Sequence, residues 1–317
     1  MRIVIPGGTG QIGHVLARHF QSAGHEATVL SRQVAAAPWR IVQWDGVTAG
    51  TWISALEGSD VCINLAGRSV NCRYHAKNRQ AIYDSRIKTT RLLNDVIANL
   101  REPPRVWLNA STATIYRHAL DRAMEEEGGE LGGNEPARPI PGTSPSALRR
   151  IGKKLSLPRP RRAPANSPCA VPSLSAPIDG AFDVFLHLVR YGLGGAQGTG
   201  RQFVSWIHEA DFTRAIDFVL AREELKGVVN LAAPHPLPNR EFMKALRDAL
   251  GISFGLPANT WMIEMGTFLL RTESELVLKS RRVIPGRLLD AGCRFLFSEW
   301  PDAARDLVRQ WRENRTR

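Results

Sequence analysis

Three glycines at a spacing of three residues, Gly7, Gly10 and Gly13, lie between a short apolar run and a helical pattern. In such a loop, the first glycine permits a tight turn and the second lets the backbone approach a pyrophosphate. The third lets the helix pack on the preceding strand. The helix N-terminus then offers N–H groups and a partial positive charge to phosphates. A glycine turn without a ligand is the alternative. The pattern predicts dinucleotide contacts at the loop residues Gly7, Thr9, Gly10, Gln11, Ile12 and Gly13.

The type of dinucleotide is indicated by Ser31-Arg32, which follows the second apolar run. An NAD site usually has an acidic residue there, about 20 residues after the loop, to bind the ribose 2′-hydroxyl. An arginine can instead pair with a 2′-phosphate and stack on the adenine. Ser31 and Arg32 therefore predict NADP(H) rather than NAD(H), with an ordinary surface arginine as the alternative.

A second backbone segment predicted to contact the cofactor is Asn64-Leu65-Ala66-Gly67, at the end of the fourth apolar run. The carboxyl ends of strands line the ligand crevice in open α/β sheets. We therefore expect this segment beside the cofactor ribose, although a simple strand-to-helix turn would have the same residues.

His208 and Asp211 could form an acid/base pair, because they follow Ser205-Trp-Ile at a short spacing. A structural role, joining a lobe to the sheet, is the alternative. The four cysteines, Cys62, Cys72, Cys169 and Cys293, form no CxxC pair. That spacing argues against a disulfide framework or a metal site and fits a reducing cytoplasm. No segment reaches the roughly 18 apolar residues of a membrane span, so no membrane partner is expected.

The elements that must position these residues alternate between strands and helices. Apolar runs predict strands over 2–6, 26–30, 41–44, 61–65 and 105–109, and helical spacing predicts helices over 11–23, 51–56 and 75–100. Such alternation is typical of an α/β fold, here a Rossmann-type doubly wound parallel sheet. From residue 182 onward helices dominate, over 182–191, 209–223, 239–250, 258–270 and 301–313, with a short strand near 228–231. We expect a Rossmann domain over 1–225 and a smaller, mainly helical C-terminal lobe over 226–317.

Together with the glycine loop and residues 64–67, the patterns Ser85-Arg86-x-x-x-Thr90 and Ser111-Thr-Ala-Thr-Ile-Tyr116 resemble the extended short-chain dehydrogenase/reductase superfamily. The later chain resembles its atypical epimerase-like branch, whose C-terminal domain has no known function. The matching stretches are 192–208, Asp211, 230–234, 239–242 and 282–292. The resemblance covers about 1–138 and 180–312.

The resemblance implies NADP(H) contacts from Ser31, Arg32, Asn64, Leu65 and Arg86. It also implies that Thr112 hydrogen-bonds the oxygen of a small-molecule substrate, which the sequence does not identify. The usual Tyr-x-x-x-Lys acid/base pair is absent from the whole chain, as is the Trp-Glu pair of the atypical branch. An NADP(H)-binding epimerase-like oxidoreductase is therefore expected, with a non-catalytic NADP(H)-binding sensor or scaffold as the alternative.

The net charge of +12 is concentrated in one stretch. Residues 139–178 hold seven Arg or Lys side chains, no acidic one, and nine of the 20 prolines. Such a composition predicts coil, where the fold should have a helix and a sixth strand. The stretch lacks the interleaved aromatic residues of a nucleic-acid site, so no nucleic-acid partner is expected, and a homodimer is left open.

A displaced reading frame would explain this stretch. In this hypothesis, each true codon consists of the last base of one codon as given and the first two bases of the next codon. Residues 139–178 are then compatible with a different amino-acid pattern. That pattern, Trp-x-Phe, Asp-Trp-Glu-Lys, Lys-x-Ala-Leu-Arg and Pro-Asp-Arg, resembles the atypical branch and includes the missing Trp-Glu pair. The chain would then be an inactive, frame-damaged copy. A genuine disordered insert is the alternative.

The nucleotide sequence that encodes residues 135–182 tests this hypothesis. We predict a one-base displacement that enters near Pro139 and returns near Gly180. A continuous frame through the region would instead show that the insert is genuine.

Overall fold

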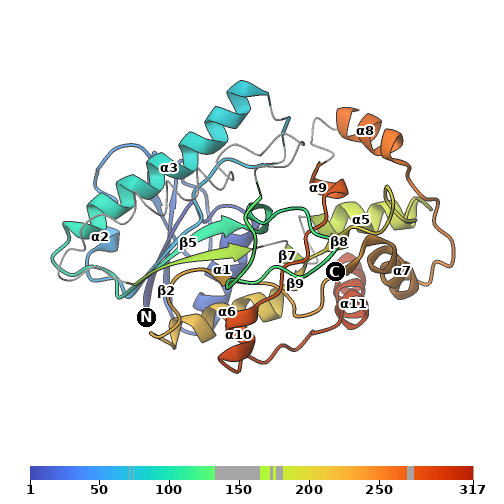
Figure 1. The fold of residues 1–317 in the computed structure, drawn as a ribbon. Helices are drawn as coiled ribbons and strands as arrows, with labels where there is room; N and C mark the ends of the chain where they lie inside the picture. The colour runs from blue at the N-terminus through green and yellow to red at the C-terminus, as the bar shows by residue number, and fades with distance from the viewer. Residues whose placement is uncertain are drawn as a thin grey trace.

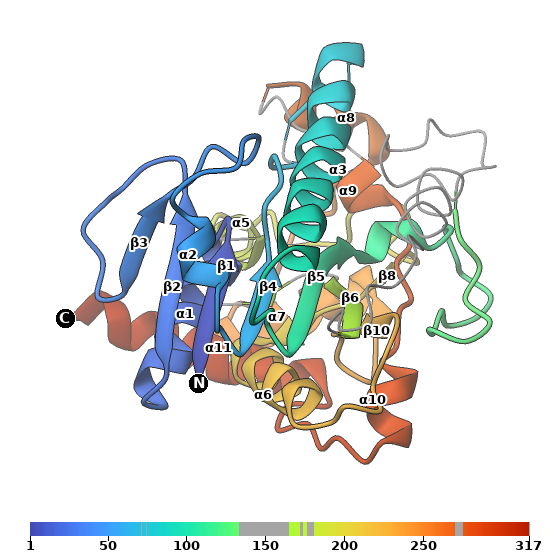
Figure 2. The ribbon, with the colours of Figure 1, turned by 90° about the vertical axis from the view of Figure 1, so that its left-hand side faces the viewer.

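The computed structural model describes residues 1–70, 72–73, 75–132, 165–171, 174–175, 181–269 and 275–316. Its centre is a seven-stranded sheet in the order β10-β6-β5-β4-β1-β2-β3, in which every neighbouring pair is parallel (Figure 2). The strands are β1 (Arg2–Pro6), β2 (Glu26–Ser31), β3 (Arg40–Gln43), β4 (Val61–Asn64), β5 (Val106–Thr112), β6 (Ala165–Val171) and β10 (Val229–Asn230). The predicted parallel, doubly wound sheet is confirmed.

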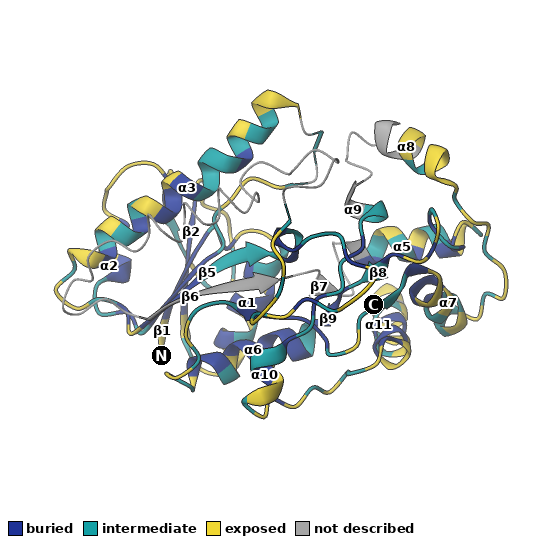
Figure 3. Ribbon diagram, in the orientation of Figure 1, coloured by how far each residue is buried: buried dark blue, intermediate teal, exposed yellow. Residues whose placement is uncertain are grey.

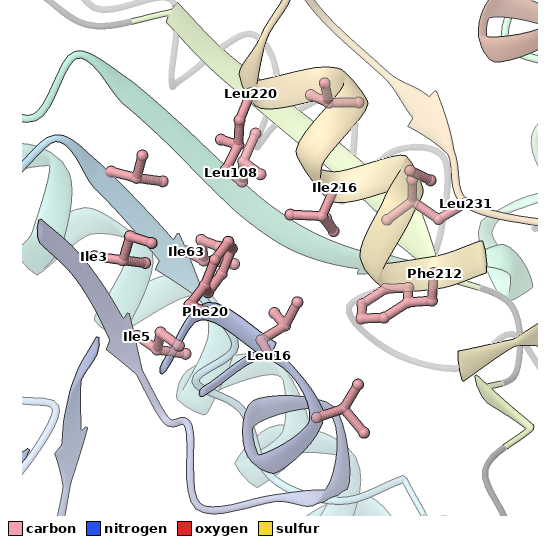
Figure 4. Packing of buried hydrophobic residues seen from close by; sticks show 14 of the residues in the cluster. Ile3, Ile5, Leu16, Phe20, Ile63, Leu108, Phe212, Ile216, Leu220 and Leu231 are labelled. Atoms are coloured by element: carbon pink, nitrogen blue, oxygen red, sulfur yellow. The ribbon is translucent and has the colours of Figure 1, made fainter. Parts of the chain in front are cut away.

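Helices cover both faces of the sheet because successive strand residues point to opposite sides. On one face, Ile3 and Ile5 of β1 pack with α1 (Gln11–Ser22) and α6 (Glu209–Leu220) (Figure 4). On the other face, Val4 packs with α2 (Ile53–Leu56) and α3 (Ala76–Ala98). Helices thus cover both faces of the sheet, and the carboxyl ends of its parallel strands lie along one edge.

A second apolar cluster joins α5 (Ala181–Arg190), α7 (Asn239–Leu250) and α11 (Trp300–Thr316). At its centre the rings of Phe242 and Trp300 stack with their centroids 4.0 Å apart, and Trp206 meets Trp300 edge-on. The cluster contains residues from before and after position 225. The division of the chain into a Rossmann domain over 1–225 and a C-terminal lobe over 226–317 stays a prediction.

Shorter elements connect these layers. They are η1 (Ala113–Ile115), β7 (Leu174–Ser175), β8 (Phe203–Val204), β9 (Ile207–His208), β11 (Leu237–Pro238), α8 (Thr260–Leu269), α9 (Glu275–Leu278) and α10 (Gly286–Asp290). In Figure 1, and in Figure 2, which is turned by 90° from it, α8 and the N-terminal end of α3 lie at the same end of the molecule. Buried residues gather on the strands and α6, whereas residues 260–265 of α8 are mostly exposed (Figure 3). Within the described ranges, no helix combines the length and apolarity that crossing a membrane requires.

The expectation of coil throughout residues 139–178 is wrong for two segments. Residues 165–171 form β6, a central strand that pairs with β5 and β10, and residues 174–175 form β7, which pairs with β9. A strand between two others forms backbone hydrogen bonds on both sides, and these do not depend on an apolar composition. Pro168 has no N–H, so β6 lacks one donor. The rest of the stretch, and the frame hypothesis with it, lies outside the described residues.

The turn from β1 to α1 depends on backbone contact that only glycine permits. A Cβ atom on Gly13 would lie 2.2 Å from the carbonyl oxygen of Gly8. By contrast, a Cβ atom on Gly10 would meet nothing within 4 Å. The first helical turn therefore packs directly on the loop, as the glycine spacing predicted.

Replacing Gly13 should therefore destabilise the fold, because the loop and α1 would have to separate. We expect Gly13→Ala to lower the free energy of unfolding by about 2 kcal/mol or more. Gly10→Ala, the matched control, should change it by less than about 1 kcal/mol. Denaturant unfolding monitored by tryptophan fluorescence measures both. Equal effects of the two variants would contradict the packing role of Gly13.

Candidate functional site

The glycine loop and the segment after β4 lie against each other at the carboxyl edge of the sheet. Gly7 has a φ of +74°, and a Cβ atom there would lie 2.5 Å from the Cα of Ala66. The N–H of Leu65 donates to the carbonyl oxygen of Pro6 at 2.8 Å. The two segments predicted separately to contact a dinucleotide are thus brought together by backbone contact.

The N-terminus of α1 has the geometry of an anion site. Its N-cap residue is Gly10, and no side chain caps the first turn. That turn contains no acidic residue, Thr9 is exposed, and Gln11 and Ile12 are half-buried. The first N–H groups of a helix have no partner within the helix, and the aligned peptide dipoles add positive charge. The open space around Gly10 leaves room for a phosphate group.

The end of β2 presents one cation at this edge. Ser31 is buried, and its side-chain oxygen accepts a hydrogen bond from the N–H of Gln33 at 3.3 Å. Arg32 is exposed, and its guanidinium forms no hydrogen bond or ion pair with any residue that the structure describes. Residues 32–34 contain no acidic side chain that could accept a hydrogen bond from a ribose hydroxyl. The arrangement favours recognition of an anionic group.

Asn64 fixes the backbone that follows β4. Its side chain is 3% exposed, and its Oδ1 accepts from the N–H of Ala66 at 3.0 Å. Its Nδ2 donates to Oδ1 of Asn109 at 2.7 Å and to Oγ1 of Thr90 at 3.3 Å. Gly67, at the end of the segment, is exposed. Asn64 therefore links β4, β5 and α3 at the point where the predicted cofactor loop begins.

Arg86 supports the same loop from α3. Its Nη1 donates to the carbonyl oxygens of Arg68 at 3.1 Å and Ile82 at 3.2 Å. A Cβ atom on Gly67 would lie 3.3 Å from the Arg86 side chain, which therefore lies against this backbone. The contact of Arg86 with NADP(H) stays a prediction, as do the other predicted cofactor contacts.

Thr112 and Tyr116 lie at the end of β5 with their hydroxyls already engaged. Oγ1 of Thr112 accepts from the N–H of Thr114 at 3.3 Å and lies 3.1 Å from Oγ1 of Thr114. The Tyr116 hydroxyl is buried and donates to Oδ1 of Asn230 at 3.1 Å. Burial raises the pKa of Tyr116, with Asn230 acting in the opposite direction. The Tyr116 hydroxyl is thus used in a contact within the protein, and the role of Thr112 stays a prediction.

The structure favours the structural role of His208 and Asp211. Nδ1 of His208 caps α6 by accepting from the N–H of Ala210 at 3.1 Å, and its Nε2 lies 3.2 Å from a carboxylate oxygen of Asp306. Asp211 is 2% exposed, and its two carboxylate oxygens accept from the N–H groups of Leu296 and Phe297. These contacts tie the start of α6 to α11 and to the chain just before it, and they leave no acid/base pair open to a substrate.

Sequence reasoning missed Asn109 and Thr90 as members of the site. Asn109 ends the predicted fifth strand, and Thr90 belongs to the Ser85-Arg86 pattern, so both carried a positional signal. Their contact with Asn64 depends on the register of β4 against β5, which pairs Asn64 with Asn109. Among the described residues, no group of three or more His, Cys, Asp or Glu side chains could hold a metal ion.

Two family models match the chain. The NAD dependent epimerase/dehydratase family matches residues 3–137, and a domain of unknown function (DUF1731) matches residues 260–307. The predicted likeness to the epimerase-like branch is thereby confirmed, including its C-terminal domain of unknown function.

Relatives within the epimerase family match nearly the full length. Epimerase family protein SDR39U1 of Bos taurus is 29% identical over 97% of this chain and 100% of its own. Epimerase family protein YfhF of Bacillus subtilis is 26% identical over 97% of this chain and 98% of its own. The crystal structure of human SDR39U1 with NADPH has a TM-score of 0.83 at 26% identity. The structural match covers 98% of this chain and 99% of the human SDR39U1 chain.

The burial of His208 makes stability depend on pH. Burial lowers its pKa from the ordinary value of 6.5, although Asp306 and Asp211 act in the opposite direction. The unfolded chain therefore binds this proton more readily than the folded chain, and stability is lost as the pH falls through about 6.5. His208→Asn retains an N-cap acceptor and removes the titrating group. We expect it to lose less stability than the wild type between about pH 7.5 and pH 5.5.

Denaturant unfolding at several pH values measures this difference. His187→Asn, at an exposed histidine of α5, is the matched control and should keep the wild-type dependence. If the stability of His208→Asn depended on pH as that of the wild type does, His208 would not contribute to the pH dependence.

Proposed function

We propose that the protein binds NADP(H) at the carboxyl edge of the sheet and acts as an epimerase-like oxidoreductase. The observation that carries the proposal is Arg32, an exposed guanidinium at the end of β2, where NAD sites usually have an acidic residue. The uncapped N-terminus of α1 and the close contact of Gly7 with Ala66 support it. The structure of human SDR39U1 with NADPH supports the same cofactor.

The residues of this chain would bind and orient the cofactor. When bound, NADP(H) supplies or accepts a hydride at its nicotinamide ring. The N–H groups of the first turn of α1 would bind the pyrophosphate, and Arg32 would pair with the 2′-phosphate. Asn64 would hold the backbone of Leu65, Ala66 and Gly67 beside a ribose, and Thr112 would orient the oxygen of a small-molecule substrate.

The expected cytoplasmic location is supported by the thiols. Cys62, Cys72 and Cys293 are free, and Cys62 and Cys293 are buried. Unpaired thiols are typical of a reducing compartment.

A second function, a non-catalytic NADP(H)-binding sensor or scaffold, is favoured by one observation. The Tyr116 hydroxyl is buried against Asn230, and the sequence contains no Tyr-x-x-x-Lys pair that could replace it. Steady turnover on a panel of carbonyl compounds and sugar nucleotides would exclude this function, whereas tight NADPH binding without turnover would support it. A frame-damaged copy would also lack turnover, and its frame-corrected chain would regain it.

Arg32→Ala tests the proposed cofactor. We expect its Kd for NADPH to rise roughly 10- to 100-fold, because a charge-assisted contact with the 2′-phosphate is lost. Its Kd for NADH, which lacks that phosphate, should change by less than about two-fold. Titration of nicotinamide fluorescence measures both constants. Arg91→Ala, at an exposed arginine of α3, is the matched control. Equal effects on NADPH and NADH, or tighter wild-type binding of NADH, would contradict the proposal.

A further inference from the structure

The side-chain amide of Asn109 has donor capacity that the described protein does not use. Its Oδ1 accepts from Nδ2 of Asn64 at 2.7 Å and from Oγ1 of Thr90 at 3.3 Å. Its Nδ2 donates to no group in the described part of the chain, although an amide nitrogen has two hydrogens to donate. Asn109 is half-buried.

The surrounding hydrogen bonds fix the orientation of the amide. Asn64 must donate through Nδ2, because its Oδ1 accepts from the N–H of Ala66 at 3.0 Å. An Asn109 amide turned by 180° would place its own NH2 group against that donor and lose the hydrogen bond from Asn64. The oxygen of Asn109 therefore faces Asn64 and Thr90, and its NH2 group faces away from them.

The strand order places this donor on the opposite side of the glycine loop from Arg32. Arg32 follows β2, the glycine loop follows β1, and Asn109 is paired with Asn64 where β4 meets β5. In the sheet order β5-β4-β1-β2, strands β5 and β2 are three strand spacings apart, or about 14 Å. A dinucleotide with its 2′-phosphate at Arg32 and its pyrophosphate at α1 continues from there toward β4 and β5.

We propose that the Asn109 amide donates a hydrogen bond to a hydroxyl of the nicotinamide-side ribose. The inference rests on the proposed NADP(H) binding and adds a recognition residue to that site. The phosphates are bound elsewhere, at α1 and Arg32, so the group that reaches β4 and β5 is an uncharged sugar. A ribose hydroxyl is an acceptor that matches an uncharged amide donor. Asn109 thus has two functions, since its oxygen holds Asn64 and its nitrogen binds the ligand.

Four variants separate ligand donation from support of the network. Asn109→Leu removes both functions, and Asn109→Asp keeps the acceptor oxygen while it removes the donor. Thr90→Val removes only a network hydroxyl. Thr89→Val, the matched control, removes a neighbouring hydroxyl that bonds only to backbone carbonyls of α3. Thermal unfolding identifies any variant that does not fold.

The measurement is the Kd of each variant for NADPH and for NADH by nicotinamide fluorescence. We expect both Asn109 variants to weaken binding of the two cofactors by the same factor, roughly ten-fold. Thr90→Val should have a smaller effect, and Thr89→Val should bind like the wild type. The loss on both cofactors distinguishes Asn109 from Arg32, whose variant should affect NADPH alone.

Two outcomes would overturn the inference, and a third concerns the proposed function. Wild-type affinity in Asn109→Leu or Asn109→Asp would show that the amide does not contact the cofactor. A loss in Thr90→Val as large as in Asn109→Leu would assign the effect to positioning of Asn64. If the wild type itself binds neither NADPH nor NADH, the proposed function is wrong, and the role of Asn109 is excluded with it.

Discussion

The structure depends on close backbone contact at the start of the chain. Gly13 lies against Gly8, and Gly7 lies against Ala66, at separations that leave no room for a Cβ atom. The first contact seats α1 on the sheet, and the second brings the β4 segment to the glycine loop. These two contacts place the uncapped N-terminus of α1 beside the carboxyl ends of β1 and β4, where a pyrophosphate could bind.

The C-terminal part of the chain is joined to the sheet by buried polar contacts. Glu126 accepts from the N–H groups of Asn230 at 2.6 Å and Arg287 at 3.3 Å, and Asn230 also accepts from Tyr116. Burial raises the pKa of Glu126, while these donors act in the opposite direction. Tyr116, which follows the end of β5, thus attaches β10, and Glu126 attaches both β10 and α10.

Local pattern was sufficient for the glycine loop, the first five strands and the long helices, because each has a period or spacing within one segment. It failed where partners are distant. The hydrogen bond from Tyr116 to Asn230 spans 114 positions, and the one from Asn64 to Asn109 spans 45. Strands of two residues, such as β8 and β11, are too short to show alternation. The strand over 165–171 was missed because pairing with β5 and β10, rather than an apolar composition, stabilises it.

We infer that one edge of the sheet binds an intact NADP(H) molecule from Arg32 across to β5. A crystal structure of the protein with NADPH is the test of this binding mode. We expect the pyrophosphate against the N–H groups at the start of α1 and the 2′-phosphate within hydrogen-bond distance of Arg32. NADPH bound elsewhere, or a 2′-phosphate remote from Arg32, would show that the binding mode is wrong.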